Sequence, residues 1–370
     1  MIRLLQPTFD EQTKKELLEV MDSGWASFGP KVSEFEEAFA ERVGAKYAVA
    51  TNSATSALDL AIKAYGLSGG ELITPSFTFT SDAHVGEWNG MEAVFADIDP
   101  ETFCIEPESL PLSKDTKVII AVDCHGRLAD IDGIRRKVKE FNESYPTDTV
   151  IDPLIIEDSA HAIHSPGEQK GDVVVYSFQA VKFLPIFDGG MITTNDEEVY
   201  KKLRKLTWLG IEQNTYERAQ GGRYAWDYDI VDGNGIKAYM TNFQAVIGLG
   251  QLRRLDALLE KRQKIQERYN EAFHGKPWFE KPLYSRTVQY YTPKWVDRDG
   301  LNATLGEKGI HTGMHFKPLH TMTYWKKAQR IPLPHTDGVF QRILSLPVHD
   351  ALTDEEQETV IEAVKEHYGN

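Results

Sequence analysis

The 370-residue chain has only two cysteines, Cys104 and Cys124, and their spacing does not suit a metal site. We interpret both as small buried residues of a protein in a reducing cytoplasm. No apolar run approaches the roughly 20 residues that a membrane span needs. The first residues contain a proline and acidic side chains where a signal peptide needs an apolar core. The sequence therefore indicates a soluble cytoplasmic protein.

Positive charge is also scarce, with 41 Lys and Arg residues against 56 Asp and Glu and a net charge of −15. This balance argues against binding to nucleic acid or to an anionic membrane surface, although a few lysines could still hold a small phosphate. Among the eleven histidines, His315 and His320 lie five residues apart without a carboxylate or cysteine cluster beside them. We therefore predict no metal site.

Internal repeats are lacking, and what recurs is a short apolar strand followed by polar or helical sequence. Several of these strands are continuous β-branched runs, which is typical of strands covered on both faces. Residues 55–65 and 130–145 are expected to be helices. The pattern predicts an α/β domain with a mostly parallel sheet. The expected strands are residues 46–51, 71–77, 92–98, 117–123, 153–159, 172–178 and 190–195.

The composition changes after about residue 240. Residues 242–273 have a helical pattern, in which Gly248 and Gly250 indicate either a break or close packing. Thr353, followed three residues later by Glu356, predicts the start of a last helix. We predict a large domain over 1–249 and a smaller α+β domain over 250–370. The glycine-rich, aromatic loop 210–235 is expected to cover a site or an interface.

Ligands of open α/β sheets collect at the carboxyl ends of the strands, so the residues that follow the expected strands are candidates for a site. TNSAT (51–55) is a strand end, a turn of small residues and a helix start. Backbone N–H groups there, with the hydroxyls of Ser53 and Thr55, would suit a phosphate. Simple capping of the helix explains the same residues.

Asp158 ends the apolar strand of PLIIEDSAHA, and Lys182 follows DVVVYSF within SFQAVKFLPIFDGG. Taken singly, Asp158 could belong to a structural ion pair or cap a helix. Lys182 alone could be an ordinary surface lysine. Together with the TNSAT turn they fit pyridoxal phosphate, which needs a phosphate site, a carboxylate on the pyridine nitrogen and a lysine that forms a Schiff base. Phe79 could stack on the pyridine ring or belong to the core.

Eight motifs in order over some 350 residues give the chain a resemblance to the DegT/DnrJ/EryC1/StrS family of sugar aminotransferases. This resemblance implies the aspartate-aminotransferase fold, pyridoxal phosphate fold type I, with a large domain and a smaller C-terminal α+β domain. The motifs are SGWASFGPKVSEFEEAFAERVGAKYAVATNSATSAL, ITPSFTFTS, VFADIDPETF, IIEDSAHA, SFQAVK with DGG, MTNFQAVIGLGQLRRLD, GIHTGMHFKPLH and LSLPVHDALTDEE.

The resemblance implies a role for each matching residue. Lys182 would be the catalytic lysine, and Asp158 would pair with the pyridine nitrogen. His161 would contact the ring hydroxyl, and Phe79 would stack on the ring. The phosphate would be held by Ala54, Thr55, Ser177 and, from the other subunit of a homodimer, Lys237.

The family implies L-glutamate as amino donor and a nucleotide-linked keto-sugar as acceptor, with pyridoxamine phosphate formed between the two half-reactions. Phe28, Phe187, Lys317 and His320 are expected near the substrate, although a structural role for His320 fits as well. The apolar run 183–187 departs from the family pattern, and we expect it to reshape the sugar pocket. Three alternatives stay open: a sugar dehydratase, an aromatic-forming relative and a non-catalytic regulatory protein.

Overall fold

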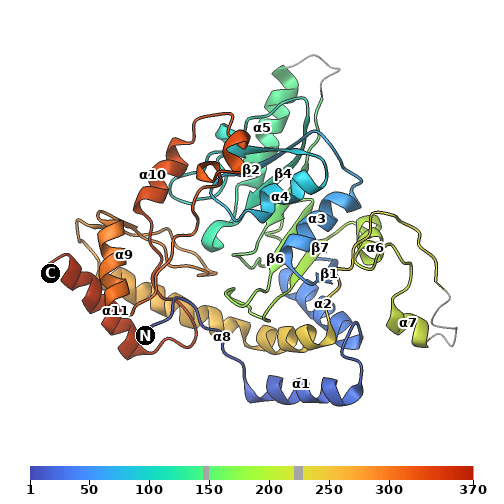
Figure 1. Ribbon diagram of the computed structural model, residues 1–370, viewed down its shortest axis with the longest axis horizontal. Helices are drawn as coiled ribbons and strands as arrows, with labels where there is room; N and C mark the ends of the chain where they lie inside the picture. The colour runs from blue at the N-terminus through green and yellow to red at the C-terminus, as the bar shows by residue number, and fades with distance from the viewer. Residues whose placement is uncertain (145–149, 221–227, 370) are drawn as a thin grey trace.

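A computed structural model describes residues 1–144, 150–220 and 228–369 and centres on a seven-stranded sheet (Figure 1). The strand order is β1-β7-β6-β5-β4-β2-β3, and β7 runs antiparallel to both of its neighbours while the remaining pairings are parallel. The predicted mostly parallel sheet and its seven strands are confirmed. The strands are β1 (Tyr47–Thr51), β2 (Glu71–Pro75), β3 (Glu92–Ala96), β4 (Thr116–Val122), β5 (Leu154–Asp158), β6 (Val173–Ser177) and β7 (Gly190–Thr194), with a separate hairpin pair, β8 (Phe279–Glu280) and β9 (Lys294–Trp295).

Helices cover both faces of the sheet because successive side chains of each strand point to opposite sides. Val49 of β1 packs into a core with α3 and α6, whereas Ala48 and Ala50 face α2 and α8 on the other side. The helices are α1 (Glu11–Ser23), α2 (Pro30–Val43), α3 (Ala54–Ala64), α4 (Ser81–Trp88), α5 (Ile131–Ser144), α6 (Glu197–Leu206), α7 (Thr215–Gln220), α8 (Asn242–Ala272), α9 (Arg298–Glu307), α10 (Pro334–Arg342) and α11 (Asp354–His367). Short 3-10 turns lie at 107–109, 124–126, 319–321 and 325–328.

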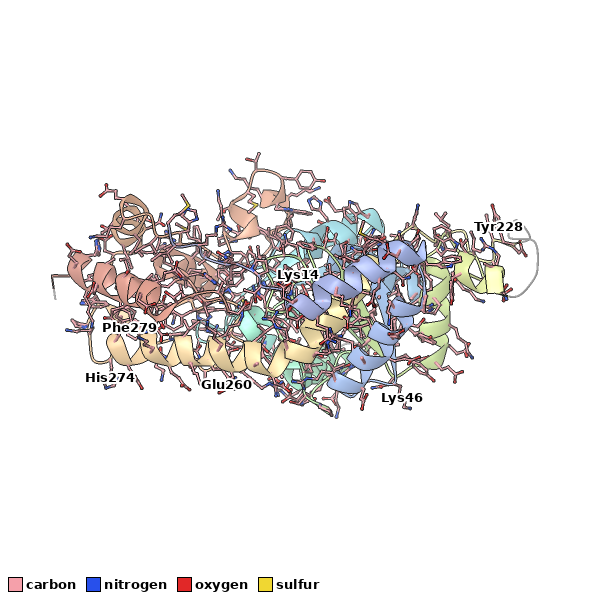
Figure 2. All side chains as sticks on the ribbon, turned by 90° about the horizontal axis from the view of Figure 1, so that it is seen from below. Lys14, Lys46, Tyr228, Glu260, His274 and Phe279 are labelled. Atoms are coloured by element: carbon pink, nitrogen blue, oxygen red, sulfur yellow. The ribbon has the colours of Figure 1, made fainter. Side chains whose placement is uncertain are left out.

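The helix α8 is unbroken over its 31 residues and begins with a capping box between Thr241 and Gln244. Figure 2 shows it running along one side of the molecule past Glu260 towards His274. Its two glycines mark close packing rather than a break. A Cβ atom at Gly248 would lie 2.7 Å from the Phe35 ring of α2. None of the helices within the described residues is both long and apolar enough to cross a lipid bilayer.

We expect Gly248→Ala to lower the free energy of unfolding by about 1–2 kcal/mol, because the overpacking cost exceeds the gain in helix propensity. Phe35 cannot yield easily, since it is fully buried and packs on Phe39 and Phe178. The matched control is Gly306→Ala in α9, where no atom lies within 4 Å of the new Cβ position. Urea unfolding should show no loss for Gly306→Ala, and equal effects at both positions would contradict this account of α8.

The C-terminal part has a core of its own, built from α9, α11, the second half of α8 and the N-terminal residue Ile2. Ile2 forms a β-bridge with Ile310, so the first residues of the chain belong to this core. The first half of α8 packs instead on the sheet through Ala245 and Leu255. The boundary at 249/250 therefore falls inside one continuous helix, and the two-domain division stays our proposal. Thr353 caps α11 in the expected capping box.

Candidate active site

A cavity of about 380 Å³ opens at the carboxyl ends of the parallel strands. Its walls come from the turn after β1, the segment after β2, the last residues of β4, β5 and β6, and the loop before β7. The cavity brings together seven of the residues predicted from the sequence: Ala54, Thr55, Phe79, Asp158, His161, Ser177 and Lys182.

One end of the cavity is the N-terminus of α3. Ser53 caps this helix, with its Oγ accepting a hydrogen bond from Ser56 N at 3.1 Å. The first N–H groups of a helix have no intrahelical partner, so those of Ala54 and Thr55 are available to an anion. Gly190 lets β7 approach this turn, because a Cβ there would lie 2.6 Å from Ala54 N.

Asp158 also lines the cavity, as the last residue of β5. Its Oδ1 accepts a hydrogen bond from Ala160 N at 2.9 Å, which fixes the carboxylate relative to the strand. Burial raises the pKa of Asp158, whereas the Ala160 hydrogen bond and the charge of Lys182 lower it. The site therefore holds a carboxylate that is costly to leave without a cationic partner.

Lys182 also lines the cavity, in a loop closed by backbone hydrogen bonds from Ala180 N to Phe187 O and from Ile186 N to Phe178 O. Burial lowers the pKa of Lys182 to about 8, against the opposing effects of Asp158 and Asp82. At pH 8 about half of the amine is neutral, compared with well under 1% for a lysine of ordinary pKa. A neutral amine in this position can act as a nucleophile and as a base.

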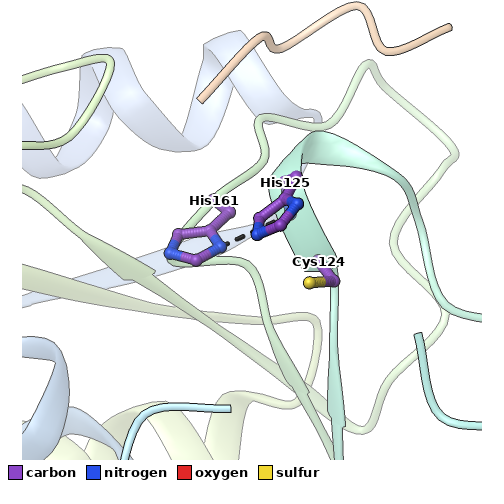
Figure 3. Close-up of side chains that lie close together, drawn as sticks. All are labelled: Cys124, His125 and His161. Carbon is purple, nitrogen blue, oxygen red and sulfur yellow. Dashed lines mark hydrogen bonds between the residues drawn. The ribbon is translucent and has the colours of Figure 1, made fainter. Parts of the chain in front are cut away.

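His161 stacks on Phe316, with ring centroids 5.4 Å apart, and its Nδ1 accepts a hydrogen bond from the backbone N–H of His125 (Figure 3). Burial, followed by the charge of Lys182, lowers the pKa of His161 well below its ordinary value. The ring is therefore neutral, and because Nδ1 accepts, the proton sits on Nε2. His161 thus offers one hydrogen-bond donor to a group in the cavity.

Comparison with known proteins identifies this arrangement. The profile of the DegT/DnrJ/EryC1/StrS aminotransferase family matches residues 7–365. The chain belongs to this family. A relative in Bacillus subtilis (strain 168), the spore coat polysaccharide biosynthesis protein SpsC, is 35% identical and is aligned over 97% of this chain and 95% of its own.

Several solved structures share the fold over nearly the whole chain. The putative sugar aminotransferase Spr1654 from Streptococcus pneumoniae, in its pyridoxamine phosphate form, superposes with a TM-score of 0.89 at 28% identity, covering 100% of this chain and 99% of its own. DesI, solved with its TDP-sugar product, gives 0.83 at 28% identity, with 98% and 93% covered. The predicted family, the type I fold, the enzyme class and the cofactor, pyridoxal phosphate, are confirmed.

The cavity of this DegT/DnrJ/EryC1/StrS aminotransferase fits that cofactor at each of its polar ends. The helix N-terminus and the hydroxyls of Ser53, Thr55 and Ser177 would hold the phosphate. Asp158 would face the pyridine nitrogen, and His161 would donate to the ring hydroxyl. Phe79, 59% exposed and lining the cavity, is free to stack on a ring, so its alternative interpretation as a core residue is wrong.

Several lining residues were missed in the sequence. Tyr290, His315 and Phe316 come from the C-terminal part of this aminotransferase and close the cavity from that side. Tyr290 stacks on His315 with ring centroids 3.8 Å apart. Burial lowers the pKa of His315 to about 4, so this ring is neutral too. The HFKPLH motif (315–320) was the available signal, but its Phe316 was not considered and His315 was weighed only as a metal ligand.

The residues expected near the substrate lie outside this cavity. Lys317 is exposed. His320 is buried, with Nδ1 2.7 Å from Ser76 Oγ and Nε2 3.1 Å from Asp337 Oδ1, which matches its structural alternative. Phe187 is 56% exposed, has a φ of +73° and packs on Phe9. The expectation that residues 183–187 reshape the pocket is wrong for Phe183, Leu184 and Ile186, which are buried in the core with α2 and α8.

A second cavity, of about 310 Å³, lies beside α6. Phe28 lines it together with Trp25 and Tyr239. Lys237 is exposed nearby, with its Nζ 5.7 Å from the Trp208 ring centroid. The loop 210–235 includes α7, which projects beyond the sheet in Figure 1, and its residues 221–227 are outside the described part of the chain.

Within the described part of the chain, two clusters of side chains are compact enough to consider for a metal. Cys124, His125 and His161 form one. His161 Nδ1 is occupied by the His125 N–H, and burial raises the pKa of the Cys124 thiol well above its ordinary value. A thiol that stays protonated is a poor ligand. In the second cluster, His164 Nε2 lies 3.1 Å from Glu157 Oε1 and 3.5 Å from Asp123 Oδ2, so these groups are already paired with one another. The absence of a metal site stays our prediction.

Proposed function

We propose that this enzyme transfers an amino group from L-glutamate to a nucleotide-linked keto-deoxysugar and so forms an amino sugar for glycan or natural-product biosynthesis. The observation that carries the proposal is the placement of Lys182, Asp158 and the α3 N-terminus around one cavity. Bound pyridoxal phosphate supplies the electron sink that makes a proton on the neighbouring substrate carbon acidic.

The residues of the chain supply binding and proton transfer. The neutral Nζ of Lys182 would accept the proton from the carbon of the amino donor, and its ammonium form would give a proton to the carbon of the sugar acceptor in the second half-reaction. Asp158 would keep the pyridine nitrogen protonated, and His161 would orient the ring through its Nε2–H. These roles need only the cavity positions and pKa shifts described above.

The sugar acceptor is supported by the relatives. SpsC is named for polysaccharide biosynthesis, Spr1654 is a putative sugar aminotransferase, and DesI was solved with a TDP-sugar. Lys182 argues against the sugar dehydratase alternative, because resembling dehydratases have histidine at that position. A complete set of Lys182, Asp158 and phosphate-binding groups argues against a non-catalytic regulatory protein.

A homodimer with shared active sites is part of the proposal. Lys237 is exposed and lies outside the cavity of its own chain. A residue that reaches the phosphate site of the other subunit is expected to have these two properties. Exposed apolar side chains precede it in the chain, including Leu209, Ile230 and Val231, and Trp208, next to Leu209, forms a β-bridge with Lys237. Such surface is typical of an interface. A cytoplasmic location is also proposed, and Cys104 and Cys124 support it as free buried thiols.

The test separates donor from acceptor. Adding L-glutamate alone to the loaded enzyme should abolish the visible absorbance of the cofactor and release one 2-oxoglutarate per subunit. Keto-sugars on different nucleotides are then screened for return of the absorbance, and the product mass is measured. No 2-oxoglutarate would contradict the donor. An aromatic or dehydrated product, or no response to any nucleotide-linked keto-sugar, would contradict the acceptor.

A further inference from the structure

Gln289 is a buried side chain from the C-terminal part of the chain that reaches the loop of Lys182. Its exposed fraction is 0%, and its Nε2 donates a hydrogen bond to Val181 O at 2.7 Å. Val181 immediately precedes Lys182, so the acceptor is the carbonyl group of the peptide bond that joins these two residues. The sequence analysis did not select Gln289.

This peptide bond is held at both of its polar groups. Its N–H, which belongs to Lys182, donates to Gln179 O at 2.8 Å, and the preceding N–H, of Val181, donates to Gln179 Oε1 at 3.2 Å. A peptide unit is planar, so fixing its C=O and its N–H together leaves it little freedom to rotate. The backbone from which the Lys182 side chain starts is therefore fixed, and Gln289 supplies the hydrogen bond that comes from outside the loop.

Gln289 can act as a rigid anchor because its neighbours in sequence belong to the C-terminal core. Val288 and Tyr291 are both fully buried there. Arg262 of α8 donates from Nη1 to Val288 O at 3.1 Å, and Tyr291 forms a β-bridge with Leu346. The position of Gln289 is thus set by the fold of the C-terminal part and not by the loop that it contacts.

A second buried glutamine, Gln251 of α8, contacts the same loop farther from the lysine. Its Nε2 donates to Pro185 O at 3.2 Å and to Thr8 O at 2.9 Å. Gln251 and Gln289 both pair with loop carbonyl groups that lie outside strands and helices, as buried backbone polar groups require. The difference is the place of the acceptor, because only the Gln289 bond falls on the peptide group next to the Lys182 Cα atom.

We propose that Gln289 is a positioning residue that holds the backbone of Lys182 so that its Nζ meets the cofactor. The inference rests on the proposed role of Lys182. Val181 is 37% exposed, so without Gln289 its carbonyl group can turn towards water and rotate the peptide bond. A rotation at the base of a long side chain displaces its end, and a misplacement of about 1 Å at a reacting group can cost about 10²-fold in rate.

Two forms of the cofactor separate positioning from packing. The aldehyde of pyridoxal phosphate forms a C=N bond with Lys182 Nζ and releases one water, whereas pyridoxamine phosphate has no aldehyde and forms no bond to the lysine. Gln289→Met nearly keeps the size of the side chain and removes the donor. In the cofactor-free protein, its affinity for pyridoxal phosphate should fall about tenfold, while its affinity for pyridoxamine phosphate should stay within about twofold of wild type.

Gln251→Met is the matched control. It removes an amide from the same loop, and it should leave the ratio of the two affinities as in wild type. Thermal melting checks that the variants fold. If Gln289→Met does not fold, Gln289→Asn gives the same comparison, because its amide stays polar but is one methylene group too short to reach Val181 O.

Three outcomes overturn the proposal. An equal loss of affinity for both cofactor forms in the Gln289 variant indicates a role in packing alone. An unchanged ratio of affinities indicates that Lys182 is placed without Gln289, and the same selective loss in Gln251→Met indicates that no single amide positions it. The comparison uses no substrate. A failure here is therefore distinguishable from a failure of the glutamate half-reaction, which tests the proposed function.

Discussion

Lys182→Ala is expected to lower transamination turnover by at least about 10³-fold, because the variant loses both the nucleophile and the group that moves the proton. No other lysine lines the cavity among the described residues, so no neighbour can replace it. The measurement is steady-state release of 2-oxoglutarate from L-glutamate in the presence of a keto-sugar acceptor.

The fold should survive this substitution. The pKa of Lys182 is lowered to about 8, so the folded state binds fewer protons than the unfolded state between pH 8 and the ordinary lysine value. Below pH 8 the buried cation therefore costs stability, and its removal should not lower the melting temperature of the cofactor-free protein. Lys201→Ala, on the surface of α6, is the control for activity. Normal turnover in Lys182→Ala would contradict the assignment.

Asp158→Asn has the second largest expected effect. The amide has nearly the same shape and can still accept from Ala160 N, but it carries no charge to hold a proton on the pyridine nitrogen. Loss of such a preorganised charge is expected to lower kcat by about 10²–10³-fold. Turnover with saturating cofactor and glutamate measures the effect free of any change in cofactor affinity.

The matched control is Asp123→Asn. Asp123 comes directly after β4, in a position like that of Asp158 at the end of β5. Asp123 is also buried, and its Oδ1 accepts a backbone hydrogen bond from Ala129 N. Burial, and then the charge of Glu157, raise the pKa of Asp123 to about 8. It is therefore mostly neutral at pH 7, and an amide replaces it without removing a charge. Equal losses in the two variants would show that buried polar packing, and not the charge of Asp158, supports catalysis.

The sequence predicted the features that depend on local signals. Apolar β-branched runs placed the seven strands, and Thr353 with Glu356 placed the start of α11. Because parallel strands present their carboxyl ends at one edge of the sheet, residues after different strands, such as Thr55, Asp158 and Lys182, were expected at a common site. The cavity contains all three.

The features that were missed depend on tertiary packing. Tyr290 and Phe316 reach the site only because α8 and the segments after it fold back across the strand ends. Phe183, Leu184 and Ile186 follow the catalytic lysine in sequence, yet they point into the core. Sequence proximity to Lys182 was not a guide to proximity in space.

The central claim, that Lys182 carries the cofactor, is tested most directly by borohydride reduction of the loaded enzyme followed by peptide mass spectrometry. The reduction fixes a cofactor that is joined to an amine as a permanent mass increase on one lysine. The account predicts this increase on the peptide that contains Lys182, at one per subunit. A modification on another lysine, or none in protein that holds the cofactor, would contradict it.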